Sequence, residues 1–133
     1  MRKMTMMLSG CLLFVAASGS AQTPDWSHAK RVEIDLVNFK FTPATITLQH
    51  GQPYVLHFVN MASGSHNFAA KQFFSAATIA AEDSTAVKGG MIELHGNDSA
   101  DVRLVAPAVG TYEAHCSHFM HSTFGMTGSV VVQ

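Results

Sequence analysis

The chain has 133 residues, 47% of them hydrophobic, and a formal net charge of −1 from 8 basic and 9 acidic residues. This length suits one domain with a packed core. The few Lys and Arg residues are scattered, which excludes the clustered basic surface that nucleic-acid binding requires.

The N-terminus has the order of segments that is typical of a secretory signal peptide. Arg2 and Lys3 form a short basic region, an apolar run follows over residues 12–17, and small residues lead to Ala21. This order predicts cleavage after Ala21 and export to the periplasm. The apolar run is too short for a permanent membrane anchor. We therefore expect a signal peptide over residues 1–21, one domain over residues 22–133, and no stable membrane insertion.

If the signal peptide is cleaved after Ala21, it removes one of the two cysteines and leaves the other in the domain. Cys11 ends a Leu-Ser-Gly-Cys sequence that looks like a lipoprotein cleavage box, but most of the apolar segment comes after it instead of before it. We therefore expect Cys11 to leave with the signal peptide. Cys116 is then the only thiol of an exported domain and has no partner for an internal disulfide. Such a cysteine is either a buried apolar side chain or, given its neighbours, a metal ligand.

Short strands separated by Gly, Pro and Asn turns dominate the rest of the chain. Apolar and polar residues alternate in several of them, which is the period of a strand with one buried face. The residues between 69 and 90 are less regular and predict one short helix or a packed loop. The pattern indicates an all-β fold, a Greek-key β-sandwich. Strands are expected over residues 32–36, 45–48, 54–60, 101–105, 111–116 and 128–132.

Soft and imidazole ligands gather between the last two expected strands. Cys116, His121 and Met126 follow one another at intervals of five residues. A thiolate, two imidazoles and a distant thioether form a ligand set that copper prefers. The second imidazole must come from another loop, and His66, which follows the strand over 54–60, is the best candidate. Zinc could use the same Cys and His residues, but the methionine favours copper.

Several motifs around these residues are similar to those of one known family. They lie at residues 46–51, 58–60, 66–68, 110–112 and 116–128. Together they resemble the cupredoxins, the family of plastocyanin, azurin and pseudoazurin, over residues 32–133. The resemblance implies one blue (type 1) copper ion with His66, Cys116 and His121 as equatorial ligands and Met126 as the axial ligand. It also implies that Asn67 joins the two ligand loops by hydrogen bonds.

The resemblance further implies a carrier of single electrons between redox partner proteins, without enzymatic turnover. A protein that buffers or delivers copper is the alternative, because His115, His118 and Met120 add spare ligands near Cys116. Its partners would be copper donor and acceptor proteins. In either case we expect a monomer.

Two histidines near Cys116 leave the ligand set open. His118 competes with His121, but the interval of five residues from His121 to Met126 matches the family. His115 directly precedes Cys116, as in copper oxidases and nitrite reductases, where such a histidine serves a second copper centre. Strand alternation places His115 and Cys116 on opposite faces, and the further His-x-His clusters of a second centre are absent from the sequence.

The remaining aromatic and imidazole side chains receive structural roles. Phe68, Phe119 and Phe124 are expected to form an apolar collar around the site, and Met120 is expected to fill the loop. His121, inside that collar, is the expected exit for the electron. Surface or hydrogen-bonded structural roles are expected for His28, His50, His57 and His95.

Overall fold

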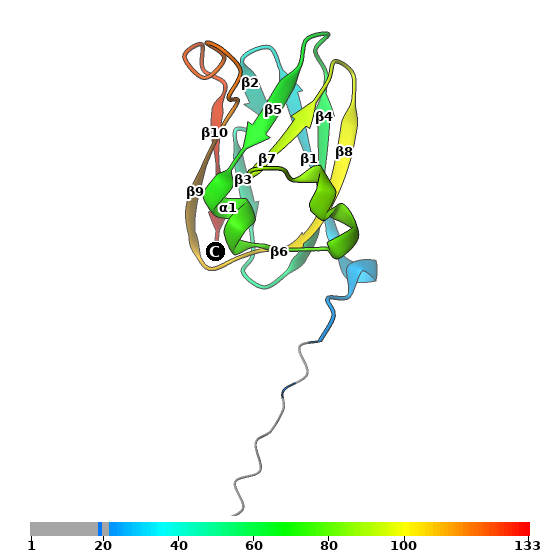
Figure 1. The fold of residues 1–133 in the computed structure, drawn as a ribbon. Helices are drawn as coiled ribbons and strands as arrows, with labels where there is room; N and C mark the ends of the chain where they lie inside the picture. Colours follow the sequence, from blue (N-terminus) through cyan, green and yellow to red (C-terminus); the bar gives the residue numbers. More distant parts are fainter. Residues whose placement is uncertain (1–18, 20–21) are drawn as a thin grey trace, which may run out of the picture.

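The computed structural model describes residue 19 and residues 22–133. The predicted signal peptide therefore lies outside the described residues, apart from Gly19. The described part is a β-sandwich with one short α-helix (Figure 1). None of its helices is long and apolar enough to cross a membrane. In chain order the elements are η1 (Trp26–His28), β1 (Lys30–Val37), β2 (Lys40–Thr42), β3 (Thr45–Leu48), β4 (Pro53–Asn60), β5 (His66–Ala69), α1 (Lys71–Ala76), β6 (Thr78–Ile79), η2 (Ala81–Ala86), β7 (Met91–Leu94), β8 (Ser99–Val105), β9 (Gly110–His115) and β10 (Thr127–Val132).

The strands form two five-stranded sheets. The first has the order β2-β1-β4-β8-β6 and the second has the order β3-β10-β9-β5-β7. The β1–β4 and β10–β3 pairs are parallel, and the other pairs are antiparallel. The all-β prediction is confirmed, and each expected strand corresponds to an observed one. The predicted short helix is also confirmed, since α1 lies within residues 69–90.

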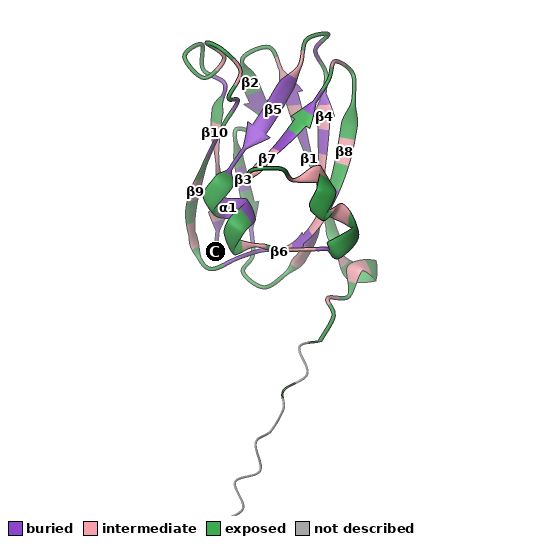
Figure 2. Ribbon diagram, in the orientation of Figure 1, coloured by how far each residue is buried: buried purple, intermediate pink, exposed green. Residues whose placement is uncertain are grey.

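The core fills the space between the two sheets because alternate residues of most strands point inward. In β4 the pattern is regular, and Tyr54, Leu56 and Phe58 are buried. Strand β5 differs, since all four of its residues are buried (Figure 2). Apolar burial of this kind contributes about 25 cal/mol per Å² of surface removed from water. The strand that begins at His66 is therefore anchored on both of its faces.

One end of the sandwich gathers three connections that lie far apart in the sequence. They are the β1–β2 turn, the β4–β5 loop and the long β9–β10 loop, which Figure 1 shows in orange. The buried Asn60 orders the second of these. Its Nδ2 lies 2.8–3.1 Å from the carbonyls of Gly64, Leu94 and His95, and its Oδ1 accepts from the Ala62 N–H. This network fixes the approach of the chain to His66.

An ion pair attaches the irregular η2 segment to the first sheet. The Arg103 side chain donates to both oxygens of Asp83 at 2.8 and 3.1 Å, and the Arg103 backbone N–H also donates to Asp83 at 2.8 Å. The hydrogen bond from Arg103 lowers the pKa of Asp83 below its ordinary value of 3.8. Since Asp83 is only 16% exposed, water screens the pair weakly.

We expect Asp83→Asn to reduce the free energy of unfolding by about 1–3 kcal/mol at pH 7, because charge-assisted hydrogen bonds are lost. A lowered folded-state pKa stabilises the fold above pH 3.8, and the contribution disappears as pH falls through the folded-state value. Urea unfolding at several pH values checks this, and the difference between the two proteins should vanish in acid. Glu82→Gln is the control, since Glu82 is 72% exposed and 3.6 Å from Arg103 and should cost less than about 1 kcal/mol. Equal effects of the two substitutions would contradict the prediction.

Candidate metal centre

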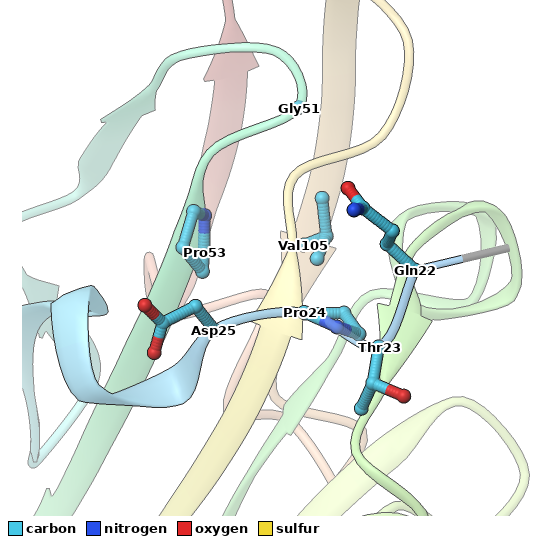
Figure 3. Close-up of a pocket in the computed structure, with 7 residues that line it drawn as sticks. All are labelled: Gln22, Thr23, Pro24, Asp25, Gly51, Pro53 and Val105. Carbon is cyan, nitrogen blue, oxygen red and sulfur yellow. The ribbon is translucent and has the colours of Figure 1, made fainter.

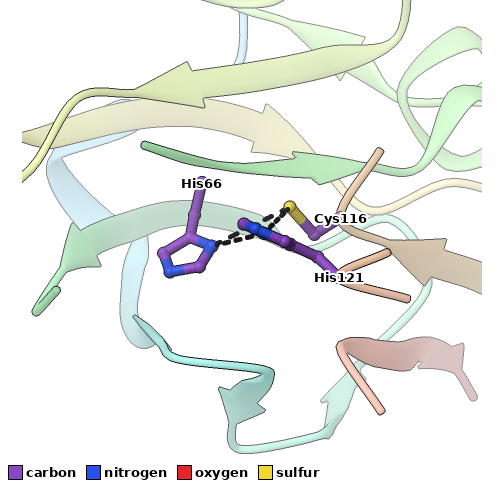
Figure 4. Close-up of side chains that lie close together, drawn as sticks. All are labelled: His66, Cys116 and His121. Atoms are coloured by element: carbon purple, nitrogen blue, oxygen red, sulfur yellow. Dashed lines mark hydrogen bonds between the residues drawn. The ribbon is translucent and has the colours of Figure 1, made fainter. Parts of the chain in front are cut away.

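Three donor atoms converge at the gathered end of the sandwich. They are Nδ1 of His66, Sγ of Cys116 and Nδ1 of His121, which point toward one another in Figure 4. The two nitrogens are 3.1 Å apart, and the sulfur lies 3.9 Å from His66 Nδ1 and 3.4 Å from His121 Nδ1. His66 and Cys116 are 1% and 0% exposed, and His121 is partly exposed.

These separations fit a single metal ion in a trigonal plane. Metal–nitrogen bonds of about 2.0 Å and metal–sulfur bonds of about 2.3 Å, the lengths of zinc sites, place trigonal donors about 3.5 Å (N to N) and about 3.7 Å (N to S) apart. The observed values differ from these by a few tenths of an ångström. Shifts of this size are within the reach of side-chain rotation, so the three residues can hold one ion without a change of backbone.

One strand and one loop supply these residues. His66 is the first residue of β5, Cys116 directly follows β9, and His121 lies in the turns between β9 and β10. Met126 closes the loop, since its N–H donates to the His121 carbonyl and its carbonyl accepts from the Cys116 N–H, both at 3.0 Å. The Met126 side chain is completely buried. Gly125 before it has a φ of 107°, which a residue with a Cβ rarely adopts.

Asn67 joins the two ligand segments, as predicted. Its Oδ1 accepts from the Ser117 N–H at 2.8 Å and its Nδ2 lies 2.7 Å from the Ser117 hydroxyl. Its own backbone N–H donates to Cys116 Sγ at 3.5 Å. A hydrogen bond to sulfur stabilises the thiolate form, which is the form that binds a metal.

The β1–β2 turn contacts both histidines, and the sequence analysis missed it. Asn38 Oδ1 is 3.0 Å from His66 Nε2, so that nitrogen carries the proton and Nδ1 keeps a free lone pair for a metal. The Phe39 ring packs edge-on against His121 with centroids 5.3 Å apart. Phe39 has a φ of 67°. In the sequence, Asn38 and Phe39 look like ordinary residues of a turn. No local pattern indicates that they contact the two histidines.

The electrostatics of the site keep His66 neutral. Burial lowers the pKa of His66 below its ordinary value of 6.5, and the neighbouring His121 and His118 add to this effect. A neutral imidazole is the form that coordinates a metal. The site therefore offers a neutral imidazole from the buried His66, a second imidazole from the partly exposed His121 and one sulfur donor from the buried Cys116.

Comparison with known proteins decides the family. A family model described as a cupredoxin-like domain matches residues 6–132. The chain belongs to the cupredoxin-like family. The family binds copper, and two imidazoles, a thiolate and a thioether make a typical type 1 copper site. Copper is therefore the cofactor that this donor set fits, and the predicted resemblance is confirmed.

Solved structures show the same fold. An auracyanin from the photosynthetic bacterium Roseiflexus castenholzii, reduced with dithionite, is 21% identical with a TM-score of 0.58, covering 79% of this chain and 98% of its own. Auracyanin A, a "blue" copper protein of Chloroflexus aurantiacus, is 20% identical with a TM-score of 0.53, covering 77% and 99%. A multi-copper oxidase from Pseudomonas thermotolerans is 19% identical with a TM-score of 0.64, and only 31% of it is covered, against 84% of this chain. No curated protein matches the sequence.

The spare histidines of this cupredoxin lie outside the donor group. His118 stacks on His121 with centroids 5.5 Å apart, but its Nε2 is 2.6 Å from Glu93 Oε1. His115 is exposed on the face of β9 opposite Cys116, as strand alternation predicted. The other four histidines have hydrogen-bond partners, as expected, and these are Asp25 for His28, the Pro107 carbonyl for His50, Asp101 for His57 and Ser65 for His95.

The predicted apolar collar is partly wrong. Phe119 and Phe124 are 90% and 60% exposed in the ligand loop, but Phe68 is 1% exposed and belongs to the core. Phe68 follows Asn67 on β5, so its side chain points to the opposite face of this strand, which is buried on both faces. There it packs on Phe41 and Phe58. Phe39 takes the expected place beside His121. Met61 and Met120 are also exposed at 59% and 39%.

A surface pocket lies at the other end of the sandwich and takes no part in the metal centre. Pro53 at the start of β4, Val105 at the end of β8 and Pro24 line it (Figure 3). Its walls hold no imidazole or thiol. The converging donor atoms of the described residues lie at the opposite end, where β5 begins and β9 ends.

Proposed function

We propose that this cupredoxin carries single electrons between redox partner proteins through one type 1 copper ion. His66, Cys116 and His121 are the equatorial ligands and Met126 is the axial ligand. The observation that supports this assignment is the convergence of three donor atoms within 3.1–3.9 Å, two of them on fully buried residues. Copper, when bound, supplies the Cu(I)/Cu(II) couple.

The chain contributes rigidity and access. Asn38 fixes the ring of His66, Asn67 fixes Ser117 and the sulfur, and Met126 closes the loop through its backbone. These contacts hold the donors in one arrangement, so little reorganisation accompanies electron transfer. His121 is the partly exposed ligand and is bordered by Phe39. It is the proposed point of electron exchange with a partner.

The export signal is part of the same proposal. Cleavage after Ala21 would release residues 22–133 into the periplasm, where a soluble carrier meets its partners. Mass spectrometry of the protein recovered from that compartment should give a chain that begins at Gln22. A retained N-terminus, or lipid on Cys11, would contradict it.

The decisive test is spectroscopic. The exported protein receives one equivalent of Cu(II), and its visible and electron paramagnetic resonance spectra are recorded. An intense visible band with compressed copper hyperfine splitting supports the electron carrier. A pale, ordinary Cu(II) spectrum, or binding of Cu(I) alone, overturns it in favour of copper buffering or delivery. His118 and Met120, which are 34% and 39% exposed in the loop between β9 and β10, are the observation that favours this second function.

Met126→Leu tests the axial assignment. Removing a thioether donor stabilises Cu(I) relative to Cu(II), so the reduction potential should rise while copper stays bound to the other three ligands. Leucine and methionine have similar volumes, so the core around this completely buried side chain should lose less than about 1.5 kcal/mol. Redox titration monitored by the visible band measures the potential. Complete loss of copper, or an unchanged potential, would rule out a weak axial role for Met126.

A further inference from the structure

Glu93 contacts both segments that carry proposed ligands, the one that begins at His66 and the one that begins at Cys116, although it lies outside every predicted ligand motif. It projects from β7, which lies at the edge of its sheet and pairs with β5. Its Oε1 is 2.6 Å from His118 Nε2, and its Oε2 accepts from Asn67 Nδ2 at 2.9 Å. One carboxylate thus contacts the residue after His66 and the residue two positions after Cys116.

The contact with Glu93 determines the orientation of the Asn67 side-chain amide. A carboxylate only accepts hydrogen bonds, so it must face the Nδ2 of Asn67 and not the Oδ1. The Oδ1 is then directed to the Ser117 N–H at 2.8 Å. The same residue donates its backbone N–H to Cys116 Sγ. Glu93 therefore orients the Asn67 side chain, which joins the two ligand segments.

The contact with His118 fixes the position of that ring beside His121. The His118 ring stacks on His121 with an interplanar angle of 29° and lies outside the group of converging donor atoms. The hydrogen bond of its Nε2 to Glu93 fixes the His118 ring in this stacked position beside His121. A residue on another strand, Glu93, thus holds the second of the two candidate histidines in place.

We propose that Glu93 is a positioning residue of the copper centre, and that its negative charge lowers the reduction potential of the bound copper. The inference rests on the proposed function. A nearby anion stabilises the more highly charged Cu(II) state relative to Cu(I). The same carboxylate fixes Asn67 and His118, so the loop keeps its arrangement whether or not metal is bound.

The charge is tested with Glu93→Gln, which keeps the size and a carbonyl acceptor. At pH 8 and a fixed applied potential, the Cu(I)/Cu(II) ratio should rise about three- to tenfold over the wild type. Glu113→Gln is the matched control, since it changes the net charge equally on the next-but-one strand, β9, from an exposed position. Equal shifts in both variants, or no shift in Glu93→Gln, would overturn the electrostatic role.

The positioning is tested in the metal-free protein. Hydrogen–deuterium exchange of the Ser117 amide should be faster in Glu93→Ala than in the wild type, and unchanged in Glu113→Ala. Unchanged exchange in Glu93→Ala would overturn the positioning role. A wild-type protein without an intense visible band would overturn the proposed function instead, because the exchange result does not depend on copper.

Discussion

Cys116→Ser is expected to abolish the intense visible band completely. The thiolate is the soft, covalent donor of a type 1 site, and a serine hydroxyl cannot replace its charge transfer to Cu(II). The side chain is 0% exposed and takes a hydrogen bond from Asn67, so the substitution leaves a buried hydroxyl in a prepared position. The fold should persist, since the volume changes little. Visible absorption at one equivalent of Cu(II) measures the outcome.

The control for this variant is the residue next to it. His115→Ala removes an imidazole that lies exposed on the opposite face of β9, so the band should keep its position and intensity. A band that survives in Cys116→Ser would exclude the thiolate as ligand. A band that disappears in His115→Ala would show that the exposed histidine takes part in the centre, against the alternation of the strand.

Phe68→Ala is expected to have the largest effect on stability. The ring is 1% exposed and packs on three others, Phe41, Phe58 and Phe74, with centroids 5.0–6.2 Å apart. Truncating a core phenylalanine costs about 3–5 kcal/mol, because the cavity collapses only partly. In a domain of this size that loss lowers the melting temperature by roughly 10 °C or more.

Phe124→Ala is the matched control. This ring lies in the ligand loop, is 60% exposed and contacts Phe39. Its removal should change the free energy of unfolding by no more than about 0.5 kcal/mol. Calorimetry of the two variants side by side measures the difference. A similar loss of unfolding free energy in both variants would contradict the burial of Phe68 in the core.

The sequence could point to the candidate ligands because three of them lie close together in the chain. Cys116, His121 and Met126 lie within eleven consecutive residues, and only a few ligand sets combine thiolate, imidazole and thioether. The longer strands were equally accessible, because one buried face imposes a period of two. Strand β5 escaped detection for the opposite reason, since four consecutive buried residues leave no alternation.

The surroundings of the ligands could not be predicted in the same way. Asn38, Phe39 and Glu93 reach the site from turns and strands that are distant in sequence. In the sequence they look like ordinary turn or surface residues. They contact the site only because the strands pair as they do. The misplacement of Phe68 has the same origin, because the face that a residue presents depends on the strand register, which tertiary structure sets.

The position of β10 links metal binding to the completion of folding. This strand pairs in parallel with β3, so that Val130 lies beside Ile46, a partner far earlier in the chain. Three of the four proposed ligands lie in the loop that leads into β10. The fourth, His66, is the first residue of β5. Contacts of such long sequence separation form late, since they require the closure of long loops. A chain that has not yet docked its C-terminus has a thiol but no enclosed site, so copper uptake should report that the last strand is in place.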